Sequence, residues 1–269
     1  MDHDPPLEVF FNAFVRATGG ERVETLIDLE NPPPNADYFF RNQNVIVELK
    51  ALERETFGEN HRQKTADLFA DWQRRRLLMV YGTARVDMAQ LPPVCQQEWL
   101  NLLGKPLQKN VLSKANAQIR ETKGLLNVPD AKGVLLVASD GNFDLTPHTI
   151  HYLLSRLLMK NHPDGRQQYS QIDGIAYFSG RTLVQVGEDG RPAMVWISGP
   201  RRKDDEAITG FLSHLARAWH QYVERITARP QERLDVNPDR IKDLRFAGLA
   251  PPMPRISLAH RPKKGSPTR

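Results

Sequence analysis

Hydrophobic positions recur along the chain with the spacing of helices in some segments and of strands in others. Apolar residues three or four apart predict helices over residues 7–17, 64–79, 110–126, 146–160 and 206–226. Alternating or short continuous apolar runs predict strands over residues 37–41, 45–50, 133–138, 172–178, 183–186 and 193–197. Residues 23–29 fit either a short strand or a helical turn. This mixture predicts an α/β fold with a mixed central sheet flanked by helices.

The same pattern predicts the domain organisation. We expect one domain over residues 1–228, because no linker interrupts the succession of elements. Residues from about 52 to 107 have a mixed pattern around one helix, and we interpret them as an insertion. From residue 229 onward prolines and charges dominate. They predict a basic, partly disordered C-terminal tail over residues 229–269, with a helical turn or two at 239–246.

Composition and cysteine content narrow the class of protein. The chain has 269 residues, 40% of them hydrophobic, which is enough to bury a sizeable core. None of its apolar runs approaches the roughly 20 residues that a membrane-spanning helix needs. The single cysteine, Cys95, excludes an intramolecular disulfide, and the acidic N-terminus lacks the basic region of a secretion signal. These features predict a cytoplasmic protein with no membrane partner.

The net charge of +5 is unevenly distributed. Residues 229–269 hold ten Lys or Arg against four Asp or Glu, whereas residues 1–228 hold 27 against 28. A basic tail suits a polyanionic partner such as nucleic acid, because each phosphate that it neutralises releases counterions. A tail that only keeps the protein soluble fits the charge equally well. Two basic runs in the body, Arg74–Arg76 and Arg201–Lys203, are further candidates for phosphate contacts.

The segment 45–50 combines an apolar strand with two opposite charges. Alternation places Ile46, Glu48 and Lys50 on one face of this strand. A strand this apolar is expected in the centre of a sheet, where buried charges are costly unless they are paired or bound to a metal. The alternative is an edge strand on which Glu48 and Lys50 simply face water.

The preceding strand brings a second carboxylate to the same place. A turn centred on Asn42 and Gln43 would pair Asp37 directly with Glu48, with Cβ atoms about 5 Å apart. Two carboxylates that close repel each other unless a cation lies between them. Hard oxygen ligands in this arrangement predict a site for Mg²⁺ or Mn²⁺.

These residues resemble a known signature. The segment Pro34-Asn35-Ala36-Asp37, followed after ten residues by Glu48-Leu49-Lys50, is similar to the Asp…Glu-x-Lys motif of the PD-(D/E)XK nucleases. That superfamily includes restriction endonucleases and archaeal-type Holliday-junction resolvases. Its order of helix, Asp strand, Glu-x-Lys strand, helix, strand and helix resembles the order expected here from Leu7 to about Lys160.

The resemblance implies a restriction-endonuclease-like core and hydrolysis of phosphodiester bonds, with DNA as the favoured partner. It implies that Asp37 and Glu48 bind the metal, helped by the carbonyl of Leu49. Lys50 would orient or activate the attacking water, or stabilise the charge that develops on the phosphate. Endonuclease and exonuclease activity are both compatible with the motif.

The resemblance also implies two site residues on helices. Members of the superfamily carry an acidic residue on the first helix, and Glu8 is our choice, with Glu21 and Glu24 as competitors. Some members use a glutamine near the metal, which favours Gln118 on the helix 110–126. In the exonuclease branch a tyrosine follows four residues later. This chain has Thr122 there, so it departs from that branch.

Two other hypotheses stay open. In the first, the fold belongs to a binding module that holds nucleic acid or a protein without cleavage, which the near-neutral body favours. Alternatively, the chain is an interaction protein in which the paired acidic strands have no chemical role. A homodimer or a separate protein partner is compatible with all three hypotheses.

Overall fold

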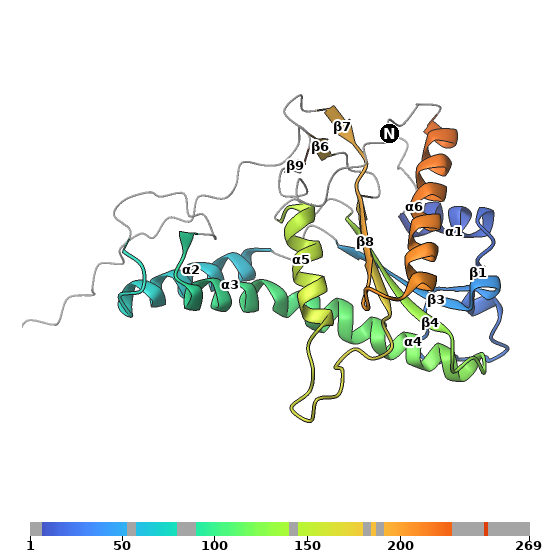
Figure 1. Cartoon of the computed structure of the whole chain (residues 1–269), viewed down its shortest axis with the longest axis horizontal. Coiled ribbons are helices and arrows are strands. Elements are labelled where there is room, and N and C mark those ends of the chain that lie inside the picture. Colours follow the sequence, from blue (N-terminus) through green and yellow to red (C-terminus); the bar gives the residue numbers. More distant parts are fainter. Residues whose placement is uncertain are drawn as a thin grey trace, which may run out of the picture.

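The centre of the protein is a six-stranded mixed sheet (Figure 1). A computed structural model describes residues 7–52, 58–79, 90–139, 145–179, 184–186, 191–227 and 245–246. In spatial order the strands of the central sheet are β1 (Glu21–Arg22), β2 (Tyr38–Phe40), β3 (Val45–Leu52), β4 (Lys132–Ser139), β5 (Gly174–Ser179) and β8 (Trp196–Pro200). The mixed α/β class predicted from the sequence is confirmed.

The three central strands are parallel, and antiparallel strands flank them. β3 pairs with β4 and β4 with β5 in parallel, whereas β2 runs antiparallel to β3 and β8 runs antiparallel to β5. Parallel strands are usually buried on both faces, so their sequences are almost continuously apolar. The run Val134–Ala138 in β4 has this composition, and all five residues are fully buried.

Helices cover both faces of this sheet. The helices of the described residues are α1 (Leu7–Ala17), α2 (Glu59–Arg74), α3 (Pro93–Pro106), α4 (Ser113–Leu125), α5 (Pro147–Leu158) and α6 (Glu206–Thr227). α1 and α6 pack on one face, around Phe11 and Trp219. α4 and α5 pack on the other, around Ile119 and Leu154. The two faces of β3 therefore meet different helices.

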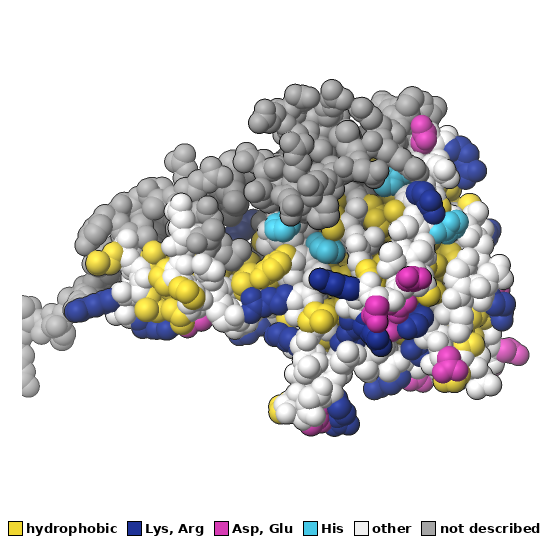
Figure 2. Space-filling view, in the orientation of Figure 1, with side chains coloured by type: hydrophobic (Ala, Val, Ile, Leu, Met, Phe, Trp, Pro, Cys, Tyr) yellow, Lys and Arg dark blue, Asp and Glu magenta, His cyan; other side chains and the backbone are white. Residues whose placement is uncertain are grey.

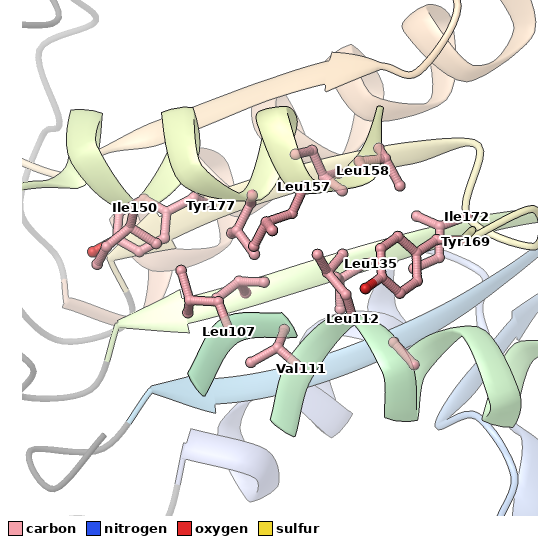
Figure 3. Packing of buried hydrophobic residues seen from close by; sticks show 14 of the residues in the cluster. Leu107, Val111, Leu112, Leu135, Ile150, Leu157, Leu158, Tyr169, Ile172 and Tyr177 are labelled. Atoms are coloured by element: carbon pink, nitrogen blue, oxygen red, sulfur yellow. The ribbon is translucent and has the colours of Figure 1, made fainter. Parts of the chain in front are cut away.

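One continuous helical segment runs from α3 into α4 through a π turn. The π segment, Leu107–Leu112, follows Pro106, whose ring leaves a backbone position without an N–H. Leu107, Val111 and Leu112 are buried and pack toward α5 and β4, as Figure 3 shows. The sequence predicted only the C-terminal half of this segment, because Pro106 and the changed spacing of a π turn interrupt the helical repeat.

The expected insertion has a small core of its own. Phe69 and Trp72 of α2 pack against Leu91 and Cys95 at the start of α3, and the two helices extend to one side of the sheet (Figure 1). α2 begins and ends about five residues before the predicted helix 64–79. It ends before Arg76, whose positive φ of 56° breaks the helix.

The strand predicted over residues 193–197 is wrong as a single element. The chain forms β7 (Arg191–Ala193), leaves it, and forms β8 from Trp196. Met194 and Val195 still pack against opposite hydrophobic clusters, so the two-residue alternation continues through the break. Alternation alone therefore could not separate the two strands.

A second, three-stranded sheet joins part of the tail to the body. β6 (Val184–Val186) pairs antiparallel with β7 and with β9 (Arg245–Phe246). The helical turns predicted at 239–246 are therefore wrong for the last two residues, because their backbone pairs with a strand. The rest of that prediction and most of the tail lie outside the described residues.

The ambiguous segment 23–29 contains a short 3₁₀ turn, Val23–Thr25, rather than a strand. Among the described residues, none of the helices has an apolar stretch of the length that crossing a membrane requires.

Candidate active site

The predicted hairpin is present with the predicted register. Tyr38 pairs with Val47 and Phe40 with Val45, so the next position along the ladder places Asp37 opposite Glu48. Asn44, in the left-handed conformation with φ of 52°, closes the turn between the strands. The two carboxylates therefore lie on the same face of the sheet.

That face is the one covered by α4. Ile46, two residues before Glu48, and Phe39, two residues after Asp37, both belong to the hydrophobic cluster that includes α4. The alternative of an edge strand facing water is therefore wrong, because β3 lies between β2 and β4. The side chain of Glu48 is 0% exposed and that of Lys50 is 21% exposed.

Glu48 is a buried carboxylate with few partners. Lys50 Nζ forms an ion pair with Glu48 Oε1, and the Asp37 carboxyl is within hydrogen-bonding reach. Among the described residues, neither oxygen of Glu48 accepts a hydrogen bond of good geometry. A buried carboxylate normally accepts several, since leaving its oxygens unsatisfied costs about 1–3 kcal/mol or more. Apart from the ion pair with Lys50 and the contact with Asp37, the oxygens of Glu48 are therefore available to a cation.

Both carboxyl groups have raised pKa values. Burial, with the neighbouring Asp37 adding to it and Lys50 opposing it, raises the pKa of Glu48 from 4.5 to about 8. Burial also raises the pKa of Asp37, although the backbone N–H of Leu49 and the charge of Lys50 oppose the increase. The N–H of Leu49 donates to Asp37 Oδ2 at 2.7 Å. A cation placed between the two carboxylates would favour their charged forms.

Gln118 connects the lysine to the loop before Asp37. Lys50 Nζ donates to Gln118 Oε1 at 2.9 Å, and Gln118 Nε2 donates to the carbonyl of Asn35 at 2.9 Å. These two bonds fix the orientation of the amide, with its oxygen toward the ammonium group. Gln118 therefore holds Lys50 in place, and the sequence placed it correctly near the site.

Thr122 is a positioning residue that the sequence did not identify. Its side chain is fully buried, and its hydroxyl accepts a hydrogen bond from the N–H of Ala36 at 2.8 Å and donates to the Gln118 carbonyl at 2.9 Å. Because Ala36 precedes Asp37, this hydroxyl anchors the start of the acidic strand to α4. The only signal in the sequence was its position four residues after Gln118.

The three candidate helical acids have different surroundings. Glu8 is exposed on α1, and its charge contributes to raising the pKa of Asp37. Glu21 forms an ion pair with Arg41, and Glu24 forms one with Arg22. Of the three, only Glu8 contributes to the electrostatics of Asp37, which favours the choice made from the sequence.

Most arginines of the two basic runs already form ion pairs or hydrogen bonds within the protein. Arg74 and Arg75 form ion pairs with Asp71, and Arg75 also with Glu98. The guanidinium of Arg201 is buried and donates to the carbonyls at the end of α5 and in the loop before β5, namely those of Leu158, Tyr169 and Ile172. Arg201 is therefore a structural residue, and the expectation that it contacts phosphate is wrong.

The donor set fits a magnesium or manganese ion. Within the described residues no group of three or more His, Cys, Asp or Glu side chains could hold a metal. Mg²⁺, however, is commonly held by one or two carboxylates, with water and phosphate oxygens completing the coordination. Asp37 and the unsatisfied oxygens of Glu48 match that requirement.

Comparison of the chain with protein-family models, curated proteins and solved structures gave no match.

Proposed function

We propose that the protein is a metal-dependent nuclease that hydrolyses phosphodiester bonds in DNA. The observation that carries this proposal is the buried carboxylate of Glu48, which lies beside Asp37 and has no hydrogen-bond donor of good geometry among the described residues. A structural carboxylate at this depth would accept several hydrogen bonds, whereas Glu48 has only the ion pair with Lys50 and the neighbouring Asp37 carboxyl among the described residues. A carboxylate that binds a metal ion does not need further hydrogen-bond donors, because the cation compensates its buried charge.

Each side chain has a separate task in the proposed reaction. A bound Mg²⁺ supplies polarisation of the scissile phosphate and a water of lowered pKa. Asp37 and Glu48 would hold the ion, and the Leu49 carbonyl would be the third ligand that the sequence motif implies. The ammonium group of Lys50 stabilises the negative charge that develops on the phosphate or orients the attacking water. Gln118 prevents Lys50 from turning away, because its amide oxygen accepts from Nζ.

The order of elements also supports the proposal. α1 comes first, then the antiparallel pair β2 and β3, then α4, β4 and α5, and β4 lies parallel to β3. This is the order that the resemblance to the PD-(D/E)XK nucleases implied, with α2 and α3 inserted after β3. The preference for DNA over RNA rests on that resemblance alone.

The direct test is a cleavage assay with purified protein. We expect cleavage of some DNA substrate in Mg²⁺ or Mn²⁺ and none in EDTA. Glu48→Gln should reduce cleavage to the level of the EDTA control, because an amide is a poor ligand for a hard cation and carries no charge to balance it. The substrates should include linear duplex, single-stranded, flapped and branched DNA, with RNA as a comparison.

The matched control is Glu24→Gln, which makes the same chemical change in a carboxylate that forms a surface ion pair. It should cleave at the wild-type rate. Equal cleavage by wild type and Glu48→Gln would show that another site or a contaminant is responsible. Metal binding without cleavage of any substrate would instead favour the alternative, a non-cleaving module that binds nucleic acid or protein.

The same assay tests the role of Glu8. Glu8→Gln should slow cleavage and raise the metal concentration that cleavage requires, because the negative charge of Glu8 acts at Asp37. Glu21→Gln should do neither, since Glu21 pairs with Arg41. The opposite result would assign this role to Glu21 of β1.

A further inference from the structure

A basic cleft lies between the start of α2 and the junction of α3 with the π segment. It has a volume of about 550 Å³ and is lined by side chains of both helices: Gly58, Glu59, Asn60, His61, Lys64, Lys105, Pro106, Lys109 and Asn110. Three of these are lysines and two are asparagines. Glu59 is the one acidic residue of the lining, and its side chain is 89% exposed.

The lysines of the cleft differ from the other basic groups of the insertion. Lys64, Lys105 and Lys109 are exposed, and among the described residues none of them forms an ion pair. Arg74 and Arg75, in contrast, are neutralised by Asp71 and Glu98. Unpaired lysines on opposite walls of one cleft repel each other, so an anion between them is stabilised.

The lining favours a phosphate backbone over bases. It contains none of the Phe, Tyr or Trp side chains on which bases usually stack, and its one ring, that of His61, is only partly exposed. Lysine ammonium groups and asparagine amides are donors suited to phosphate oxygens. The first backbone N–H groups of α2, at Glu59 and Asn60, lie at the same cleft, and a helix N-terminus adds a partial positive charge.

The cleft is connected to the candidate active site by two segments. Gln118, which holds Lys50, lies on the same continuous helical run as Lys109 and Lys105, with Lys114 one turn before Gln118. At 1.5 Å per residue, Lys109 and Lys105 lie about 14 and 20 Å from Gln118 along the axis. On the opposite wall of the cleft, Gly58 comes six residues after the end of β3 in the sequence. In Figure 2, Lys and Arg side chains gather along the edge formed by α3 and α4.

We propose that this cleft binds the phosphate backbone of the DNA flanking the scissile bond. This inference rests on the proposed nuclease function. Phosphates of one strand of a duplex advance by about 3.4 Å per base pair, so 14–20 Å corresponds to roughly four to six base pairs from the cut. The contacts are independent of base sequence, because they involve phosphates and not base edges. The inserted helices α2 and α3 thus extend the substrate-binding surface beyond the catalytic strands.

The test compares two triple variants in a binding assay. One combines Lys64→Ala, Lys105→Ala and Lys109→Ala. The control combines Arg16→Ala, Arg217→Ala and Arg225→Ala, which removes three exposed cations located elsewhere. Binding of a fluorescein-labelled duplex of about 30 base pairs, several times longer than the cleft, is measured in EDTA over a series of salt concentrations.

The cleft variant should weaken binding at low salt by at least about tenfold and lower the slope of log K against log salt by about 2 to 3, since each phosphate contact contributes about 0.9. The control variant should keep the wild-type affinity and slope. Equal losses in the two variants would mean that only total charge matters, and an unchanged cleft variant would mean that DNA does not enter the cleft. Either result overturns the inference.

Failure of this inference and failure of the proposed function are separable. Binding in EDTA does not require the metal site, whereas cleavage by Glu48→Gln tests that site alone. An unaffected cleft variant together with metal-dependent cleavage that Glu48→Gln abolishes would reject the cleft and retain the nuclease. A cleft-dependent loss of binding without cleavage of any substrate would reject the nuclease, and the cleft would then belong to a non-cleaving binding module.

Discussion

Two groups of similar charged residues lie at opposite ends of the parallel strands β3 and β4. They differ in the number of hydrogen-bond donors that reach their carboxylates. At the N-terminal end of β4, Lys132 lies between Asp173 and Asp205. Toward the C-terminal end of β3, Lys50 lies beside Glu48, with Asp37 adjacent. Each group contains one lysine and two carboxylates next to the same sheet.

The carboxylates of the Lys132 group are well supplied with donors. Asp173 accepts from the N–H of Gly133 at 2.8 Å. Asp205 accepts from Lys132 at 3.0 Å and, at the start of α6, from the N–H of Ile208 at 3.1 Å. Burial alone would raise the pKa of Asp205, but these hydrogen bonds hold it below its ordinary value. This group stabilises the fold without any additional ion.

The comparison shows that the supply of donors, and not the residue types, distinguishes the two groups. Asp173 and Asp205 lie where chain segments begin, and free backbone N–H groups are available there. Glu48 lies within β3, where the nearby backbone N–H of Leu49 donates to Asp37 and not to Glu48. The Glu48 group is therefore the one that a bound cation would complete.

The largest expected difference concerns the two lysines. Lys50→Ala should lower the cleavage rate by about 100- to 1000-fold, the usual effect of removing one group that stabilises a transition state. Lys132→Ala should leave the rate unchanged and lower the free energy of unfolding by at most about 1 kcal/mol, because Lys132 is 43% exposed and exposed ion pairs contribute little. Single-turnover cleavage and urea unfolding measure the two effects. Similar rate losses in both variants would remove the distinction between the two groups.

A smaller effect is expected in the pH dependence of stability of the metal-free protein. Unfolded Glu48 loses its proton near pH 4.5 and folded Glu48 near pH 8. Between these values the folded state binds more protons, so the free energy of unfolding should fall as pH rises, by an amount on the order of a few kcal/mol.

Glu48→Gln should remove that decrease, because the amide does not titrate. Denaturant unfolding in EDTA across this pH range measures the slope for both proteins, and Mn²⁺ should restore stability at pH 8 in the wild type only. Parallel curves for the two proteins would show that Glu48 is already stabilised in its charged form.

The smallest expected effect comes from Thr122. Thr122→Val keeps the shape of the side chain but leaves the N–H of Ala36 without its acceptor, which should destabilise the fold by about 1–3 kcal/mol. Cleavage should fall several-fold, because Ala36 precedes Asp37. Thr122→Ser retains the hydroxyl and should recover most of both losses. Thermal unfolding and cleavage assays separate a positioning role from a merely structural one, since rescue by serine requires the hydrogen bond.

Much of the fold was accessible from the sequence wherever an element has one clear periodicity of apolar residues. α1 was predicted at its observed bounds, and the register of β2 and β3 followed from the turn and from alternation. The junction of α3 and α4 was not predictable, since a proline and a π turn disturb the helical repeat. The split between β7 and β8 was hidden for the opposite reason, as the alternation continues across it.

The site was predictable only as far as neighbours along the chain determine it. Asp37, Glu48 and Lys50 lie on adjacent strands, so strand geometry alone brings them together. The hydrogen bonds of Gln118 and Thr122 link α4 to the loop before β2, a contact between segments more than 80 residues apart. Such contacts depend on how the helix packs, and periodicity contains no information about that. The cleft lysines were not recognised because their lack of partners is a property of the folded chain.

The central claim is that Asp37 and Glu48 bind a divalent metal ion, and a crystal structure with Mn²⁺ tests it most directly. The account predicts an anomalous difference peak between the two carboxylates in the wild-type protein and none at that position in Glu48→Gln crystals soaked in the same way. Absence of a peak there in wild-type crystals, at a Mn²⁺ concentration that supports cleavage, would contradict the account. An equal peak in both proteins would contradict it as well.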